Sequence, residues 1–305
     1  MADERKESAG VYATLDDLVR LQHKGRGFRF LPRQPVHSIL AGTHASRLRG
    51  RGLNFDELRN YLPGDDIRAM DWKASLRTGK PHVRIYTEER DRPAFLVVDQ
   101  RRGMFFGSQV RMKSLVAAEL GALTAWRALA QGDRVGALVF NDEEVRVTRP
   151  ERSRRNVLRI LHDIVDMNRK LVPGPSNPLM LNQVLERLLR LASHDSLIAI
   201  IGDFAGADPR SRQLATLMAR HNDVIAALVY DPLERTLPQR GNLVFAEGDR
   251  RLEFAATDSA MRGSFEKEFI DRVARTKQLL LQRSIPCLEI DTLNDPTDQV
   301  RRHLG

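Results

Sequence analysis

Short apolar segments alternate with longer helical stretches through most of the chain, and this alternation restricts the fold more than any other feature. The apolar segments predict strands at 94–99, 134–140, 197–203, 223–230 and 287–291. Strands that are apolar throughout must be covered on both faces, as in a parallel sheet with helices packed on each side. The pattern therefore predicts an α/β protein with an open, doubly wound, mainly parallel sheet.

The stretches between these strands have the periodicity and stop signals of helices. Helices are expected at 113–131, 152–167, 178–191, 209–220 and 261–282. Two further short segments, 242–246 and 252–256, predict a hairpin. Near the N-terminus, Thr14 is the expected cap of a short helix. With 42% hydrophobic residues in 305, the chain can bury a sizeable core.

Two aspartates are placed where such sheets bind ligands. Asp99 and Asp203 each end an apolar strand segment, and doubly wound sheets bind ligands at the carboxyl ends of strands, where the strand order reverses. If these two strands are neighbours, the carboxylates face each other across one crevice. Two carboxylates in that position require a cation.

Positive charge is concentrated in one segment. The chain has 49 Lys and Arg against 40 Asp and Glu, a net charge of +9, and residues 18–54 contain no acid. The bases of this segment, which we call the basic arm, are Arg20, Lys24, Arg26, Arg29, Arg33, Arg47, Arg49 and Arg51. The favoured interpretation is a solvated connector. The alternative is a docking surface for an acidic partner or for phosphates.

Cysteine usage and apolar run lengths restrict the compartment. A lone cysteine, Cys287, excludes an internal disulfide and a multi-thiolate metal site. The first ten residues lack the basic and apolar regions of a secretion signal, and the longest apolar runs, such as 197–201, are too short to cross a bilayer. We therefore expect a cytoplasmic protein without membrane insertion.

Several common catalytic motifs are missing from the sequence. It has no Gly-x-x-x-x-Gly-Lys-Ser/Thr phosphate loop, no Gly-x-Ser-x-Gly nucleophile turn and no His-Glu-x-x-His metal pair. The eight His residues are scattered singly. We therefore expect a protein that is not an enzyme.

Residues 50–92 form a stretch of different character, dense in charged residues, Gly and Pro. Tyr61 to Asp65 predicts a turn, 75–81 a loop containing Gly79, and 82–87 a strand. The stretch resembles the signature of the domain of unknown function 58 (DUF58) family. The resemblance is carried by Phe55, Glu57, Leu58, Arg59, Tyr61, Pro63, Gly64, Asp65, Asp66, Arg68, Asp71, Trp72, Lys73, Ala74, Ser75, Arg77, Thr78 and Gly79.

The resemblance implies a signature module followed by a von Willebrand factor type A-like domain, in agreement with the doubly wound sheet. The expected division is an N-terminal helix and basic arm at 1–45, the signature module at 46–92 and the type A-like domain at 93–305. The mixed charges of the signature predict an ion-pair network that holds irregular backbone, with Trp72 as a packing anchor. A nuclease-like metal cluster of Asp65, Asp66 and Asp71 is a weaker alternative, because interleaved bases reduce the negative field.

Type A domains often hold a divalent cation through an Asp-x-Ser-x-Ser loop, a Thr and a later Asp. The resemblance matches Asp99 and Asp203 to the two acids and Ser176 to the Thr, but Arg101 and Gly103 replace both serines. A degenerate site without metal or other cofactor is therefore expected, with Mg²⁺ as the disfavoured alternative. The permanent charge of Arg101 either replaces the cation or points to solvent.

The resemblance also implies partners. Proteins of this family typically accompany a MoxR-type AAA+ ATPase and are thought to help it remodel or mature client complexes. The expected function is a non-catalytic adaptor that recognises an unidentified protein client or tethers the ATPase, through the crevice, the basic arm or both. The competing interpretation is a nucleic-acid-binding module using the basic arm with Phe28 and Phe30, although nucleic acid is the less expected partner. A metal-dependent hydrolase is weaker still.

Overall fold

The computed structural model describes residues 10–24, 53–61, 70–88, 92–238, 242–247, 250–255 and 285–304, with some positions between 263 and 276. The chain divides into two compact units. One comprises residues 1–33 and 92–305, and the other comprises residues 34–91.

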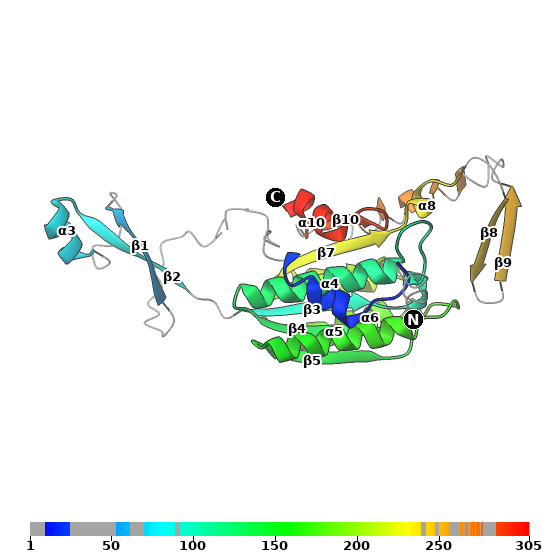
Figure 1. Cartoon of the computed structure of the whole chain (residues 1–305), viewed down its shortest axis with the longest axis horizontal. Helices are drawn as coiled ribbons and strands as arrows, with labels where there is room; N and C mark the ends of the chain where they lie inside the picture. Colours follow the sequence, from blue (N-terminus) through cyan, green and yellow to red (C-terminus); the bar gives the residue numbers. More distant parts are fainter. Residues whose placement is uncertain are drawn as a thin grey trace. The chain divides into compact units, whose positions relative to one another are not determined.

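The larger unit is built on a six-stranded sheet with the order β10-β7-β6-β3-β4-β5 (Figure 1). Its strands are β3 Pro93–Asp99, β4 Arg134–Phe140, β5 Val145–Glu151, β6 Leu197–Gly202, β7 Asp223–Tyr230 and β10 Cys287–Asp291. Neighbouring strands are parallel except β4 and β5. The chain winds outward from β3 in both directions, which confirms the doubly wound, mainly parallel α/β sheet.

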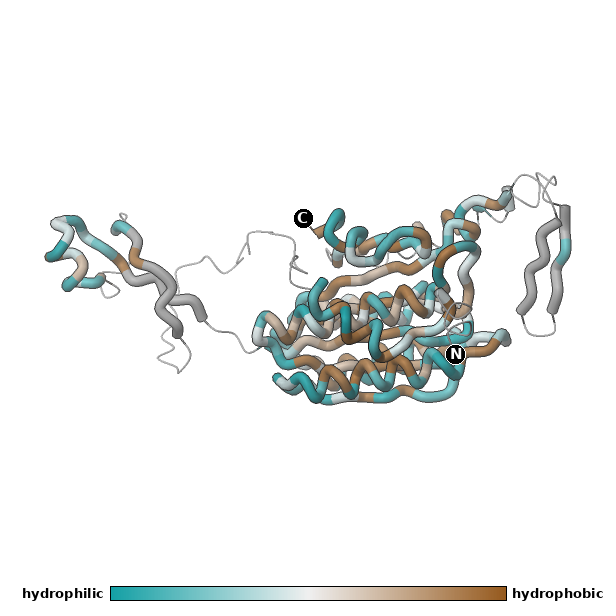
Figure 2. The backbone as a smooth tube through the Cα atoms, viewed as in Figure 1, coloured by the Kyte–Doolittle hydropathy of each residue, from teal (hydrophilic) through white to brown (hydrophobic). Residues whose placement is uncertain are grey.

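Helices cover both faces of this sheet. They are α2 Leu15–Arg20, α4 Lys113–Ala130, α5 Arg154–Arg169, α6 Met180–Leu191, α7 Pro209–Met218 and α10 Pro296–Leu304. A further short helix, α8 Pro232–Arg235, follows β7. Successive residues of β3 point to opposite faces, so Leu96 and Val98 join the core under α4 and α5, whereas Phe95 and Val97 join the core under α6 and α7. Hydrophobic residues accordingly recur along the strands and helices of this unit (Figure 2).

The N-terminal helix belongs to this larger unit. Thr14 caps α2 as predicted, its hydroxyl accepting a hydrogen bond from the Asp17 amide at 3.2 Å. Leu18 is fully buried, and its carbonyl accepts a hydrogen bond from the Trp126 indole at 3.0 Å. Burial of the apolar side of α2 therefore joins this helix to the larger unit, whereas the expected division placed it in a segment of its own at 1–45.

The smaller unit contains an antiparallel pair, β1 Leu53–Asn60 and β2 His82–Glu88, and the helix α3 Trp72–Thr78. The prediction of a loop at 75–81 is wrong over 75–78, which are helical. Asp71 caps the helix by accepting a hydrogen bond from the Ala74 amide at 2.9 Å, and Gly79 ends it with φ 71°. Gly79, which was predicted to lie in a loop, therefore marks the C-terminal end of α3.

Two further predictions concern the C-terminal third of the chain. The hairpin is present as β8 Asn242–Glu247 paired antiparallel with β9 Arg250–Ala255. The helix predicted at 261–282 lies partly outside the described residues, and its described positions from 263 to 276 are helical. Within the described part of the chain, no helix is both long and apolar enough to cross a membrane.

Candidate functional site

The crevice at the carboxyl edge of the sheet begins with the two predicted aspartates. β3 and β6 are parallel neighbours, with Val98 opposite Ile201, so Asp99 and Asp203 follow at adjacent strand ends. Both residues are buried. A Cβ atom on Gly202 would lie 2.8 Å from the Cβ of Asp99, which is too close for any real pair of such atoms. Glycine at position 202 therefore allows the Asp99 carboxyl to lie against the neighbouring strand.

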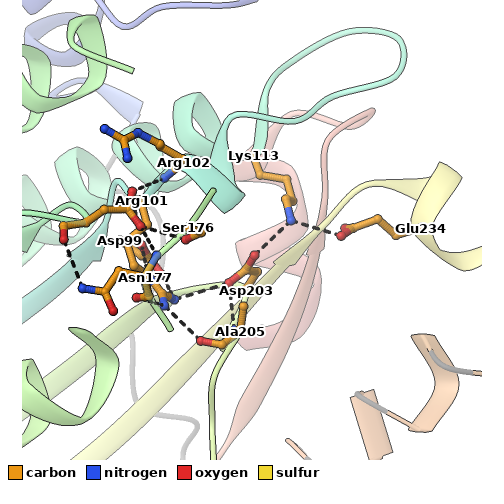
Figure 3. A network of polar contacts seen from close by, with 10 residues as sticks. Asp99, Arg101, Arg102, Lys113, Ser176, Asn177, Asp203, Ala205 and Glu234 are labelled. Atoms are coloured by element: carbon orange, nitrogen blue, oxygen red, sulfur yellow. Dashed lines mark hydrogen bonds and ion pairs between the residues drawn. The ribbon is translucent and has the colours of Figure 1, made fainter. Parts of the chain in front are cut away.

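Arg101 lies between these aspartates and is 1% exposed. Its Nε and Nη2 atoms donate to the two carboxylate oxygens of Asp99, with Nη2 at 2.6 Å from Oδ2 (Figure 3). Nη2 also lies 3.6 Å from Oδ1 of Asp203, and Nη1 donates to the Ala205 carbonyl at 3.0 Å. The guanidinium faces the Phe140 ring at 5.4 Å. The side chain does not point to solvent, and its charge lies where a cation was required.

Lys113 supplies a second internal cation that sequence reasoning missed. It is the first residue of α4, and its Nζ lies 3.0 Å from Oδ2 of Asp203 and 3.1 Å from Oε1 of Glu234 (Figure 3). A signal was present in the sequence, because a basic residue in the first turn of an otherwise apolar helix opposes the helix dipole. Such a residue requires an acidic partner elsewhere in the fold.

Ser176 and Gly103 lie beside each other in the crevice. A Cβ atom on Gly103 would be 3.5 Å from the Ser176 hydroxyl oxygen and 3.7 Å from Oδ2 of Asp203. The Ser176 hydroxyl donates to Oδ1 of Asp142 at 2.9 Å. Asp142, which also accepts from the Arg102 amide at 2.6 Å, was not predicted. It comes two residues after the end of β4, and Asp99 is the last residue of the neighbouring β3, so its place at a neighbouring strand end was the available signal.

Burial and charge act in opposite directions on the acids of the crevice. Burial raises the pKa of the Asp99 carboxyl, and the Arg101 guanidinium opposes that effect. Burial would also raise the pKa of Asp203, but Lys113 and Arg101 outweigh it and hold that pKa well below its usual range. Asp203 therefore remains ionised, paired with two cations of the protein itself.

The crevice residues do not fit a divalent metal ion. Mg²⁺ in proteins is held by carboxylates and other oxygens. Here the carboxylates of Asp99 and Asp203 are already engaged by Arg101 and Lys113. Among the residues that the structure describes, no three His, Cys, Asp or Glu side chains gather to hold a metal ion. The carboxylate oxygens of the crevice therefore belong to a closed ion-pair network.

The signature residues are only partly described. Trp72 is 62% exposed, so the prediction of a packing anchor is wrong: the first helical position of α3 directs this side chain outward, whereas Ala74 and Val83 are buried. Asp71 caps α3, while Lys73 and Arg77 are exposed. Tyr61 hydrogen-bonds through its amide to the Pro81 carbonyl at 2.9 Å.

The remaining signature and arm residues stay predictions. The side chain of Arg59 and the residues Pro63, Gly64, Asp65, Asp66 and Arg68 lie outside the described residues. The same holds for the arm residues Arg26, Arg29, Arg33, Arg47, Arg49 and Arg51. The predicted ion-pair network of the signature therefore also stays a prediction.

A comparison with known protein families tests the family membership that the signature suggested. The family model described as "Protein of unknown function DUF58" matches residues 57–275. The chain belongs to the DUF58 family. Its doubly wound, mainly parallel sheet agrees with the von Willebrand factor type A-like fold that the resemblance implied.

Relatives of this DUF58 protein include the uncharacterized protein Rv1480 of Mycobacterium tuberculosis (strain ATCC 25618 / H37Rv). It is 29% identical over 265 residues, which cover 86% of this chain and 82% of the relative. The uncharacterized protein Mb1516 of Mycobacterium bovis matches with the same identity and coverage.

Solved structures similar to the DUF58 chain include the conserved hypothetical protein BatB from Bacteroides thetaiotaomicron. Its TM-score is 0.42 and its identity 11%, and the match covers 70% of this chain and 95% of that chain. An aerotolerance-related membrane protein from Bacteroides fragilis has a TM-score of 0.41 and 14% identity, over 70% of this chain and 96% of that chain. The SpRpn10 VWA domain has a TM-score of 0.38 and 14% identity, over 69% of this chain and 94% of that chain.

Proposed function

We propose that this protein is a non-catalytic adaptor that works with a MoxR-type AAA+ ATPase in remodelling or maturing protein complexes. The observation that carries the proposal is the closed ion-pair network at the carboxyl edge. The side chains of Arg101 and Lys113 are 1% and 2% exposed, and each is paired with acids. Side chains so enclosed and paired hold structure in place and are not presented to a small substrate.

The rim of the crevice is suited to contact with a client protein. Val172 and Leu179 are 55% and 66% exposed, at either end of the loop that joins α5 to α6. Asp142 holds this loop through the Ser176 hydroxyl and the Asn177 amide. Exposed apolar side chains on an anchored loop are typical of protein interaction surfaces.

The ATPase partner rests on the family resemblance. The chain itself has no phosphate-binding loop, so the energy for remodelling comes from the partner. The basic arm would steer association with an acidic patch of the ATPase, because complementary charge raises the association rate more than the final affinity. A cytoplasmic location is part of the same proposal.

The test uses the purified full chain and the MoxR-type ATPase encoded in the same genome. We expect the two to co-elute at low salt, and we expect this chain to change ATP turnover by the ATPase without hydrolysing ATP itself. A pair that neither co-elutes nor alters turnover would overturn the adaptor function.

A charge-reversed variant tests whether the basic arm steers association with the ATPase or whether only the net charge of the chain matters. Arg47→Glu/Arg49→Glu/Arg51→Glu should slow association at low salt, and added salt should reduce the difference. The control Arg155→Glu/Arg159→Glu/Arg187→Glu has the same charge change at exposed positions of α5 and α6 and should associate at the normal rate. Equal slowing in both variants would show that only net charge matters.

A further inference from the structure

One side of α3 is fully used in holding the helix to β2. Ala74 is buried, and the Ser75 hydroxyl donates to the Asp71 carbonyl at 2.7 Å and accepts from the His82 amide at 2.9 Å. The Thr78 hydroxyl hydrogen-bonds to the His82 ring at 3.1 Å. These residues recur at helical spacing, so they define the inner face of α3.

The opposite side of α3 has two parallel rows of side chains. Trp72 and Leu76, four residues apart, are 62% and 84% exposed and form an apolar row. Lys73 and Arg77, also four residues apart, are exposed and form a basic row beside it. We call these four residues the outer face of α3. Large exposed apolar side chains rimmed by charge mark interaction surfaces.

The exposed charges described on α3 and in the turn after it have one sign. From Trp72 to Thr87 the sequence contains no acidic residue, and Lys80 adds a further exposed cation just beyond the helix. Asp71, the nearest acid before this stretch, is buried and caps the helix. The complement of the outer face is therefore a surface that is apolar along one row and acidic along the next.

We propose that the outer face of α3 docks an acidic amphipathic helix of a protein partner, and that this partner is the ATPase. The inference rests on the proposed function and deepens it, because it assigns the ATPase to α3 and leaves the crevice rim for the client. The narrow apolar row fits the row of a facing helix. A membrane surface requires a broader apolar face, and single-stranded nucleic acid requires successive stacking rings, whereas α3 has one aromatic residue.

The test compares variants of the full chain for affinity to the purified MoxR-type ATPase. Trp72→Gln/Leu76→Gln should weaken binding about tenfold or more, because a buried Trp at an interface is commonly a hot spot. Lys73→Glu/Arg77→Glu should weaken binding as well, with a smaller loss at high salt. The control Leu191→Gln/Leu217→Gln removes two exposed leucines from the larger unit and should bind normally.

An independent measurement follows Trp72 in the wild-type complex. The chain has two Trp residues, and Trp126 is 3% exposed. Hydroxyl-radical oxidation of Trp72, measured by mass spectrometry, should fall when the ATPase is added, and that of Trp126 should not change. Circular dichroism should show that Trp72→Gln/Leu76→Gln keeps its helix content.

The outcomes distinguish the two proposals. Normal ATPase binding by Trp72→Gln/Leu76→Gln, with Trp72 unprotected in the complex, would overturn the docking face and leave the adaptor function standing. No binding by the wild type would overturn both. Retention of the wild type on phosphatidylserine vesicles or on oligo-dT, lost in the same variant, would assign the face to a different ligand and overturn the inference.

Discussion

The Nζ atom of Lys113 lies 3.0 Å from Oδ2 of Asp203, and both side chains are at most 5% exposed. This ion pair joins the first residue of α4 to the residue that follows β6. Because the other oxygen of Asp203 lies 3.6 Å from Arg101, one carboxylate binds two internal cations. The carboxyl edge of the sheet is thereby closed by charge supplied from two separate parts of the sequence.

Removing Arg101 should strongly destabilise the protein. Arg101→Ala leaves Asp99 buried without its main partner, and breaking a buried pair from one side costs about 3–5 kcal/mol. Urea unfolding measures the change. Arg102→Ala, whose ion-pair partner Glu143 is 72% exposed, should cost less than about 1 kcal/mol. Equal stability of the wild type and Arg101→Ala would contradict an internal-cation role.

The wild-type crevice should not respond to divalent metal. Its thermal midpoint should be unchanged by millimolar Mg²⁺ or Mn²⁺, because the aspartates are already paired. Arg101→Ser/Lys113→Met removes both internal cations, and Mn²⁺ should then raise the midpoint, since a ligand that binds only the folded state stabilises it. Adding Asp203→Asn should abolish that response. Mn²⁺ found between Asp99 and Asp203 in the wild type would overturn the assignment.

The two glycines of the crevice should differ in their tolerance of a methyl group. Gly202→Ala should destabilise by about 1–3 kcal/mol, because the new Cβ would lie 2.8 Å from the Cβ of Asp99. Gly103→Ala is the matched control, since its nearest contact would be an ordinary 3.5 Å. Chemical denaturation of both variants checks this, and a costlier Gly103→Ala would refute the placement of these strand ends.

A half-buried glutamate on α4 should make stability depend on pH. Burial raises the pKa of Glu119 to about 7, against the effect of Arg111, whose Nε atom lies 3.5 Å from its Oε2 atom. Among the described residues, that Oε2 atom has no hydrogen-bond partner. The folded state therefore binds this proton more tightly than the unfolded state. The stabilisation is fully present below the ordinary pKa near 4.5 and is lost as pH rises to about 7, by roughly 3 kcal/mol at most.

Glu119→Gln should remove this dependence. The variant should match the wild type near pH 5 and be more stable than it at pH 8, because its amide cannot ionise. The free energy of unfolding at the two pH values is the measurement. Glu151→Gln, at an exposed position, should leave the difference between the two values as in the wild type. If the difference in free energy of unfolding between the wild type and Glu119→Gln is the same at pH 5 and at pH 8, the raised pKa is contradicted.

The strands were predictable because they are buried on both faces. Ala94 to Val98 and Val135 to Phe140 contain no charged residue, and the predicted strand bounds agree with the observed ones within a residue. Helix α3 was not predictable by the same reasoning. Apolar residues do not recur at helical spacing over a long stretch of this sequence. The helix depends on Asp71, which caps its start, and on Gly79, which ends it.

Composition and local pattern alone determined the doubly wound sheet, the Thr14 cap and the placement of Asp99 and Asp203 at strand ends. These features depend on the residues within one segment and on rules for how parallel strands connect. Only the tertiary structure decided that Lys113 reaches Asp203, that Asp142 holds Ser176, and that Trp72 faces outward. Each of these depends on which distant segments meet, because a side chain's partner in a folded chain is set by packing and not by its neighbours in sequence.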